Sequence, residues 1–348
     1  MTFALPSPRT PDPMAAPPLR WGMLGTGWIA ERFVEALHTY SRQRVVAVGS
    51  RTAEKGAQFA AKHGIGRSLV GYEAVAADPE VDIVYVATPH SEHRDNALLA
   101  IAAGKHVLIE KAFTRNLSEA TEVVDAARSA GVAVMEAMWT RFLPHMDVVR
   151  QVLADGVLGE LETAFADHGQ WFPRDPDFRL FDPFKAGGAM LDLGVYPVSF
   201  AHFALGTPGA ALATGTKAFT GVDRQISAVL TGFARHPMAH GIVTTTLAAL
   251  TPTSAFIAGD DARLEIPGPF YGPQVVTVRR RNGDVASSSE PATHEHAGLC
   301  YQAAHLATVI SEGRLESDIL PLDETLAVMA TMDELRRQVG VSLPGESL

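Results

Sequence analysis

The sequence contains a single cysteine, Cys300, in 348 residues. One thiol can form neither an intrachain disulfide nor a cysteine zinc cluster, so we interpret it as a buried or incidental residue. No apolar run is long enough to cross a membrane. Basic residues are outnumbered as well, with 29 Lys and Arg against 39 Asp and Glu and a net charge of −10. This balance argues against nucleic acids and anionic membranes as partners, because both require a basic surface.

The first 20 residues contain six prolines and lack the apolar core of a signal peptide. We interpret residues 1–18 as a disordered, proline-rich arm and expect a cytoplasmic protein. An arm that wraps a neighbouring subunit is the alternative. The rest of the chain is long enough for two domains, which the patterns below place at residues 19–139 and 140–348.

The stretch from Trp21 to Ala30 has the pattern of a strand, a tight turn and a helix, with the spacing Gly25-x-Gly27-x-x-Ala30. In a dinucleotide-binding fold the first glycine makes the turn and the second lets the backbone approach the pyrophosphate, while the small third residue allows close packing. The helix start also directs free N–H groups at the phosphates. The candidate cofactor contacts here are Gly25, Thr26, Gly27, Trp28 and Ile29.

The second predicted strand, residues 44–49, lacks an acidic residue at its end. Enzymes that select NAD usually place Asp or Glu there, about 20 residues after the glycines, to bind the ribose 2′-hydroxyl. Here the strand is followed by Ser50, Arg51 and Thr52. A guanidinium pairs with a 2′-phosphate and the hydroxyls add donors, so we expect NADP, with NAD less favoured. A surface arginine at the start of a helix is the alternative.

Strands and helices alternate up to about residue 138, which is typical of a doubly wound parallel sheet. Ligands bind at the carboxyl ends of such strands. Two further strand ends, in the segments 82–93 and 104–112, therefore provide candidate cofactor contacts. These are Thr88, Pro89, His90, His93, Glu110 and Lys111. Solvated loop histidines and a simple Glu–Lys surface pair are the alternatives.

The second half of the chain has a different pattern. A loop at 168–187 holds five aromatic residues, of which Trp171 and Phe172 are candidate substrate contacts. The next predicted helix carries Asp192 and Tyr196 on one face, although Pro197 indicates a kink or a start near residue 195. A buried tyrosine bonded to a capping aspartate is the alternative. Successive strand patterns over 210–280 predict a mostly antiparallel sheet, and two helices end the chain.

These motifs resemble the glucose–fructose oxidoreductase/inositol dehydrogenase (Gfo/Idh/MocA) superfamily over nearly all of residues 20–340. Within it, the chain looks most like dimeric dihydrodiol dehydrogenases and NADP-dependent D-xylose dehydrogenases. The segments that carry the resemblance are 25–30, 50–52, 87–93, 110–111, 136–142, 187–197 and 320–326. The resemblance implies a Rossmann domain followed by an α/β domain with an open, mostly antiparallel sheet. It further implies that the exposed face of this sheet builds a homodimer or larger oligomer.

The resemblance also implies roles for individual residues. Lys111, Asp192 and Tyr196 would face the substrate, and Arg141 would lie near the cofactor. Two positions depart from the wider family: Ala112 stands where proline is usual, and Tyr196 stands where many members have histidine. We therefore expect hydride transfer between NADP and the C–OH of a sugar or related cyclic alcohol. Tyr196 would act as acid/base, helped by the Lys111 ammonium, because a nearby positive charge favours the phenolate.

Three other functions fit parts of the sequence. The chain could bind NADP as a sensor, since dinucleotide-binding folds also host proteins without catalytic activity. It could be a sugar–sugar oxidoreductase that never releases its cofactor. A metal-assisted hydrolase would use His294, Glu295 and His296, but this trio lies in a polar loop without helical ligand spacing. We therefore expect no metal.

Overall fold

The computed structural model describes residues 3–346 and divides the chain into two units. One unit, here called the Rossmann unit, comprises Pro11–Phe142 and Thr293–Leu326. The other, here called the open-sheet unit, comprises the residues up to Thr10, Leu143–Ala292 and the residues from Ala327 onward. None of the helices within residues 3–346 is long and apolar enough to span a bilayer.

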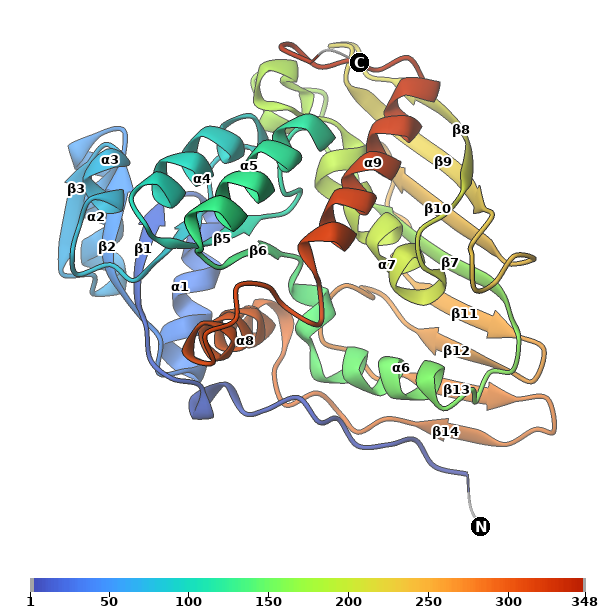
Figure 1. Ribbon diagram of the computed structural model, residues 1–348. Coiled ribbons are helices and arrows are strands. Elements are labelled where there is room, and N and C mark those ends of the chain that lie inside the picture. Colours follow the sequence, from blue (N-terminus) through green and yellow to red (C-terminus); the bar gives the residue numbers. More distant parts are fainter. Residues whose placement is uncertain (1–2, 347–348) are drawn as a thin grey trace. The chain divides into compact units, whose positions relative to one another are not determined.

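The Rossmann unit is built on a six-stranded parallel sheet with the strand order β3-β2-β1-β4-β5-β6 (Figure 1). The strands are β1 (Arg20–Leu24), β2 (Arg44–Ser50), β3 (Arg67–Val70), β4 (Ile83–Val86), β5 (His106–Glu110) and β6 (Val134–Ala137). The order reverses between β1 and β4, and doubly wound sheets bind their ligands outside the carboxyl ends of the strands at such a point.

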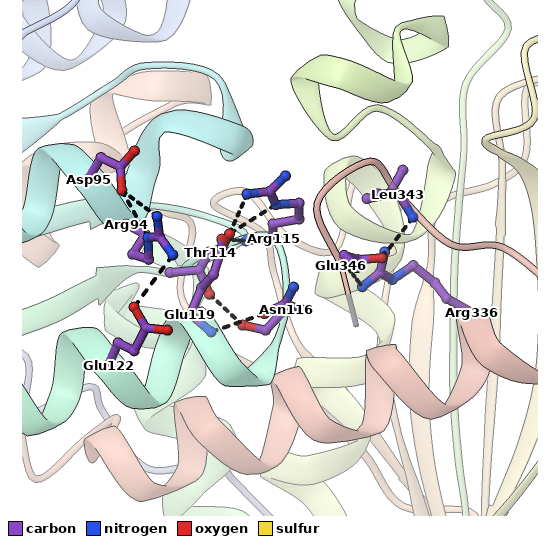
Figure 2. A network of polar contacts seen from close by, with 10 residues as sticks. All are labelled: Arg94, Asp95, Thr114, Arg115, Asn116, Glu119, Glu122, Arg336, Leu343 and Glu346. Carbon is purple, nitrogen blue, oxygen red and sulfur yellow. Dashed lines mark hydrogen bonds and ion pairs between the residues drawn. The ribbon is translucent and has the colours of Figure 1, made fainter. Parts of the chain in front are cut away.

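Helices connect these strands and cover the sheet. They are α1 (Trp28–Tyr40), α2 (Ala53–His63), α3 (Glu73–Ala76), α4 (His93–Ala102) and α5 (Leu117–Ala130), and the unit also contains α8 (Leu299–Ser311), which comes after the open sheet in sequence. Helix α1 packs with α8 and α4 packs with α5, and Figure 1 shows the two pairs on opposite sides of the sheet. The start of α5 is capped by Asn116, whose side chain accepts from the N–H of Glu119, while Glu119 pairs with Arg115 (Figure 2).

The predicted domain limits differ from the structure in the chain's last third. Residues 293–326 were assigned to the second domain, but they complete the Rossmann unit. The reason is tertiary packing: Leu299, Ala303 and Leu306 of α8 are buried, and this helix lies against α1. The sequence pattern predicts the helix but not the partner that covers its apolar face.

The described part of the proline-rich segment, residues 3–18, also differs from the predicted disordered arm, whose residues 1–2 lie outside the described residues. Residues 13–15 form a short 3₁₀ turn capped by Asp12. The carbonyl groups of Ala15 and Ala16 accept from Arg42, and that of Pro17 accepts from Gln43 at 2.8 Å. Proline has no N–H to donate, but its carbonyl can still accept a hydrogen bond. A proline-rich segment can therefore be held in place by hydrogen bonds to its backbone carbonyls.

The open-sheet unit contains an eight-stranded sheet with the order β14-β13-β12-β11-β7-β10-β9-β8. Its pairs are antiparallel except for β7 and β10, which run parallel. The strands are β7 (Leu161–Gly169), β8 (Ala210–Lys217), β9 (Asp223–Thr231), β10 (His240–Thr246), β11 (Ala255–Gly259), β12 (Ala262–Ile266), β13 (Thr277–Arg280) and β14 (Val285–Ser287). This architecture confirms the predicted fold class, α/β with a parallel and a mostly antiparallel sheet.

Helices pack on one face of the eight-stranded sheet. They include α6 (Pro144–Ala154), α7 (Val195–Leu205) and the later turns of α9 (Leu322–Gln338), as Figure 1 shows, and α7 packs against β7 and β10. Before α7 the chain forms one turn of π-helix, Met190–Gly194, so the helix changes type near Val195, two residues before Pro197. The π-helical turn and α7 both pack against β7 and β10, and all their residues except the half-buried Phe203 are buried. This packing fixes the segment that carries Asp192 and Tyr196.

Candidate active site

The glycine turn after β1 leaves space for a ligand. Gly25 has a φ of 110°, and a Cβ on it would lie 2.7 Å from the carbonyl oxygen of Ala87. A Cβ on Gly27 would meet nothing within 4 Å. Gly27 is the N-cap of α1 and supplies no capping side chain, so the first N–H groups of the helix stay available to an anion. The turn therefore fits a dinucleotide pyrophosphate.

The end of β2 carries the residues expected to select the cofactor. Ser50 is buried, and its hydroxyl accepts from the backbone of Thr52 at 3.4 Å. The side chain of Arg51 is 76% exposed, with its guanidinium 3.7 Å from the Glu92 carboxylate. The pKa of the neighbouring Tyr72 phenol is raised, chiefly by burial and then by Glu92. Sequence reasoning missed Glu92, because this acid comes from the loop after β4 rather than from the end of β2.

The loop after β4 is tied to the loop after β5 by two histidines. His93 is buried, and its ring nitrogens lie 2.9 Å from the Ala112 carbonyl and 2.8 Å from the Thr88 carbonyl. Burial lowers its pKa to about 4, so the imidazole is neutral near pH 7. His90 contacts the Lys111 carbonyl at 3.2 Å. These contacts position the backbone on both sides of Lys111, and direct contact of either histidine with a cofactor stays a prediction.

Lys111 follows β5, at the carboxyl edge of the parallel sheet. Its N–H donates to Glu110 at 3.2 Å, and its peptide bond to Ala112 is cis. The Glu110 carboxylate also accepts from the hydroxyl of Tyr85, which is fully buried within the unit. The Glu110 carboxylate therefore links the end of β5 to the buried Tyr85. Contact of Glu110 with the cofactor stays a prediction.

Arg141 lies in a buried polar cluster of the Rossmann unit. It is 2% exposed and forms an ion pair with Glu324. Nearby, Glu136 accepts from the Phe113 N–H at 3.2 Å and from the Thr325 hydroxyl at 3.4 Å. Burial raises the pKa of Glu136 to about 7, and the charge of Arg141 opposes that shift. Arg141 thus compensates acidic groups in the interior, and its expected proximity to the cofactor stays a prediction.

The open-sheet unit brings Asp192 and Tyr196 to one face of a buried helix. Asp192 pairs with Arg179 at 2.9 Å. The Tyr196 ring is stacked with Tyr271, with centroids 4.7 Å apart, and lies 5.4 Å from the His168 ring. His168 is buried near the end of β7, and Tyr271 follows β12. Neither was predicted, because an isolated His or Tyr in sequence gives no sign that it will meet Tyr196.

The aromatic loop before this helix divides into exposed and packed residues. Trp171 is 61% exposed. Phe172 packs on a small apolar cluster that includes Leu180 and Phe181, and its ring lies 5.5 Å from that of Phe178. The loop is therefore fixed at its base and leaves Trp171 accessible. Substrate contacts by Trp171 and Phe172 stay predictions.

Residues 294–296 do not form a metal site in the structure. In the part of the chain that the structure describes, no group of three or more His, Cys, Asp or Glu side chains is placed to hold a metal ion. His294 is exposed, whereas His296 is half-buried against aromatic rings of the Rossmann unit.

The strand order and the open glycine turn define a dinucleotide-binding protein with a second, open-sheet unit. Residues 19–138 match the GFO/IDH/MocA oxidoreductase family with an NAD-binding Rossmann fold, and residues 146–265 match the GFO/IDH/MocA C-terminal domain. The chain belongs to the Gfo/Idh/MocA family of oxidoreductases, which confirms the resemblance seen in the sequence.

Individual relatives lie in the expected branch. The chain is 35% identical to a trans-1,2-dihydrobenzene-1,2-diol dehydrogenase from Macaca fuscata fuscata, over 94% of this chain and 98% of the relative. It is 34% identical to a D-xylose 1-dehydrogenase (NADP(+)) from Hypocrea jecorina, over 94% of this chain and 93% of the relative. A 3-ketoreductase from Actinomadura kijaniata, solved with NADP and TDP-benzene, superposes with a TM-score of 0.80 at 26% identity, covering 93% and 98% of the two chains.

Proposed function

We propose that the protein transfers a hydride reversibly between NADP and a C–OH group of a sugar or related cyclic alcohol. The observation that carries this proposal is the buried pair of Asp192 and Tyr196 one helical turn apart, in a family member whose glycine turn is open to a dinucleotide. The similarity to a dihydrodiol dehydrogenase and to an NADP-dependent D-xylose dehydrogenase supports this class of substrate.

Each proposed catalytic residue has one task. Bound NADP supplies the hydride acceptor in the oxidative direction. As the hydride leaves the carbon, Tyr196 takes the hydroxyl proton as general base, and it returns a proton in the reverse direction. The Lys111 ammonium favours the phenolate form of Tyr196 by its charge. Asp192, held by Arg179, orients the substrate hydroxyl.

A direct assay tests this function. Purified protein mixed with NADP⁺ and a panel of aldoses and cyclic diols is expected to produce reduced nicotinamide, measured by its absorbance. A sensor would bind NADP and produce no reduced nicotinamide with any member of the panel. A sugar–sugar oxidoreductase would be purified with stoichiometric NADP and would need a second sugar to turn over.

The cofactor preference should depend on Arg51. We expect Arg51→Ala to weaken NADP binding by about tenfold or more, because a charge-assisted hydrogen bond to the 2′-phosphate is lost. NAD lacks that phosphate, so its affinity should hardly change. Isothermal titration calorimetry with both cofactors measures the two dissociation constants and so the ratio of NADP affinity to NAD affinity. Arg314→Ala, which removes an exposed ion-paired arginine elsewhere in the Rossmann unit, is the matched control. Equal losses for NADP and NAD in Arg51→Ala would exclude this role.

We also propose that the open sheet joins two or more copies of the chain. The strand register aligns an apolar row across its less buried face. The row consists of Leu212, Val229, Ile242, Phe165 and Phe256. Leu212 is 75% exposed, and the rings of Phe165 and Phe256 stack at 5.3 Å. Apolar patches of this kind mark interaction surfaces. Light scattering would give the oligomer size, and a monomer at all concentrations would exclude this assembly.

A further inference from the structure

Three aromatic side chains from distant stretches of sequence form a row in the Rossmann unit. The rings of Trp28 and His296 meet edge to face with centroids 4.8 Å apart. The rings of His296 and Trp139 are stacked, with centroids 5.7 Å apart and planes inclined by 16°. The imidazole of His296 therefore lies between two indoles, and the three residues are here called the indole–imidazole row.

The row lies where the parallel sheet receives its ligand. Trp28 follows Gly27 directly and begins α1, and Trp139 comes two residues after the end of β6. Both positions lie at carboxyl ends of strands, the edge used for ligand binding in doubly wound sheets. Trp28 is 58% exposed, so its indole is not an element of the core. The segment 293–298 thus brings a side chain from late in the sequence to the glycine turn.

The imidazole of His296 is available for a hydrogen bond. Within residues 3–346, no protein group is found to hydrogen-bond its nitrogens. Its pKa is lowered by burial and by Arg32 of α1, and Glu295 opposes this shift. Trp28 and Trp139, whose rings contact the imidazole, carry no charge. Near neutral pH the ring is therefore an uncharged imidazole, with one N–H that can donate.

The backbone next to His296 is held in a strained conformation. Glu295 has a φ of 47°, a left-handed value that is uncommon for residues other than glycine. Such strain persists where the surroundings fix it, and it is frequent at ligand sites. Thr293, at the start of the segment, is buried and bonded to Tyr301 of α8. The helix therefore holds the segment in place.

We propose that His296 is a direct ligand of the dinucleotide and donates a hydrogen bond to an oxygen of its diphosphate bridge. This inference rests on the proposed use of NADP. The glycine turn offers the diphosphate only backbone N–H groups, and the His296 imidazole adds a side-chain donor from the opposite end of the chain. The diphosphate is the relevant group because Trp28, which His296 touches, is adjacent to Gly27 and the open space in front of it.

Calorimetry with matched variants tests the proposal. We expect His296→Ala to weaken binding of NADP, NAD and ADP-ribose by about tenfold, because all three contain the diphosphate bridge and a hydrogen bond to a charged group is lost. Binding of adenosine 2′-monophosphate, which carries neither phosphate of the bridge, should not change. His294→Ala, an exposed neighbour in the same segment, should bind all four ligands as the wild type does. His296→Gln keeps an N–H donor and should recover part of the affinity.

Two further results separate ligation from a purely structural role. The His296 resonance should show a pKa that rises when ADP-ribose binds, because a nearby anion favours the imidazolium. The melting temperature of ligand-free His296→Ala should equal that of His294→Ala. Equal losses for adenosine 2′-monophosphate and NADP, or unchanged NADP affinity in His296→Ala, would overturn the assignment. Wild-type protein that binds neither NADP nor NAD would instead overturn the proposed function.

Discussion

Replacing Tyr196 by phenylalanine is expected to lower turnover by about 10²-fold or more, with NADP affinity nearly unchanged. The variant removes only the hydroxyl that exchanges a proton with the substrate. The ring stays packed on Tyr271 and beside His168, so the helix should keep its position. Steady-state kinetics with the best substrate of the panel measures kcat and KM, and calorimetry measures cofactor binding.

A control and a second substitution make this test specific. Tyr40→Phe removes an exposed hydroxyl in the Rossmann unit and should leave turnover unchanged. Lys111→Met should also lower kcat. If Lys111 acts by stabilising the Tyr196 phenolate, the kcat of the double variant should be only slightly lower than that of the less active single variant. The losses of residues that act as a unit are not additive. Full turnover in Tyr196→Phe would refute its role, and additive losses would show that the two residues act independently.

Local patterns predicted most of the elements of this fold. The strand predicted at 44–49 is β2, Arg44–Ser50, and the predicted strand, turn and helix over residues 21–30 are β1 and the start of α1, because their apolar spacing and glycine boundaries are encoded nearby. Strand β3, Arg67–Val70, was missed because it is four residues long and only half-buried. The π-helical turn at Met190–Gly194 was missed as well, since no local signal distinguishes it from an α-helical turn.

The candidate site was predictable where function depends on residues close together in sequence. Gly25 and Gly27 serve one turn, and Asp192 and Tyr196 one helical face, so spacing alone indicated both. The approach of Glu92 to Arg51 and the contact of His296 with Trp28 arise from tertiary packing between distant segments. Contacts between distant segments produce no periodic pattern in the sequence. For the same reason the placement of α8 in the Rossmann unit was not predicted.

The largest expected effect on stability comes from Arg336, a buried arginine of α9 in the open-sheet unit. Its side chain is fully buried and pairs with Asp333 and Glu346, each at 2.7 Å, and Figure 2 shows the Glu346 carboxylate between Arg336 and the N–H of Leu343. Burial acts to lower the pKa of Arg336, but the Glu346 and Asp333 carboxylates outweigh it and the pKa is raised. The ion pairs thus hold the C-terminal segment against the helix.

The same guanidinium compensates a second buried acid. Asp223 of β9 is fully buried, and its carboxylate accepts from the N–H of Met190 at 2.5 Å, where the helical segment with Asp192 and Tyr196 begins. Burial raises the pKa of Asp223, and the charge of Arg336 opposes that shift. Removing Arg336 therefore leaves two buried carboxylates, those of Glu346 and Asp223, without their nearby cation.

We expect Arg336→Met to lower the free energy of unfolding of the open-sheet unit by about 3–5 kcal/mol, the range seen when one partner of a buried ion pair is removed. Urea unfolding followed by tryptophan fluorescence and circular dichroism measures the change. Glu334→Gln, which breaks the exposed pair of Glu334 with Arg337 on the same helix, should hardly alter stability. The double variant Arg336→Met, Glu346→Leu should recover part of the loss, because it removes both charges instead of leaving one buried. If Arg336→Met and Glu334→Gln proved equally stable, the buried pair could not be what holds the C-terminal segment.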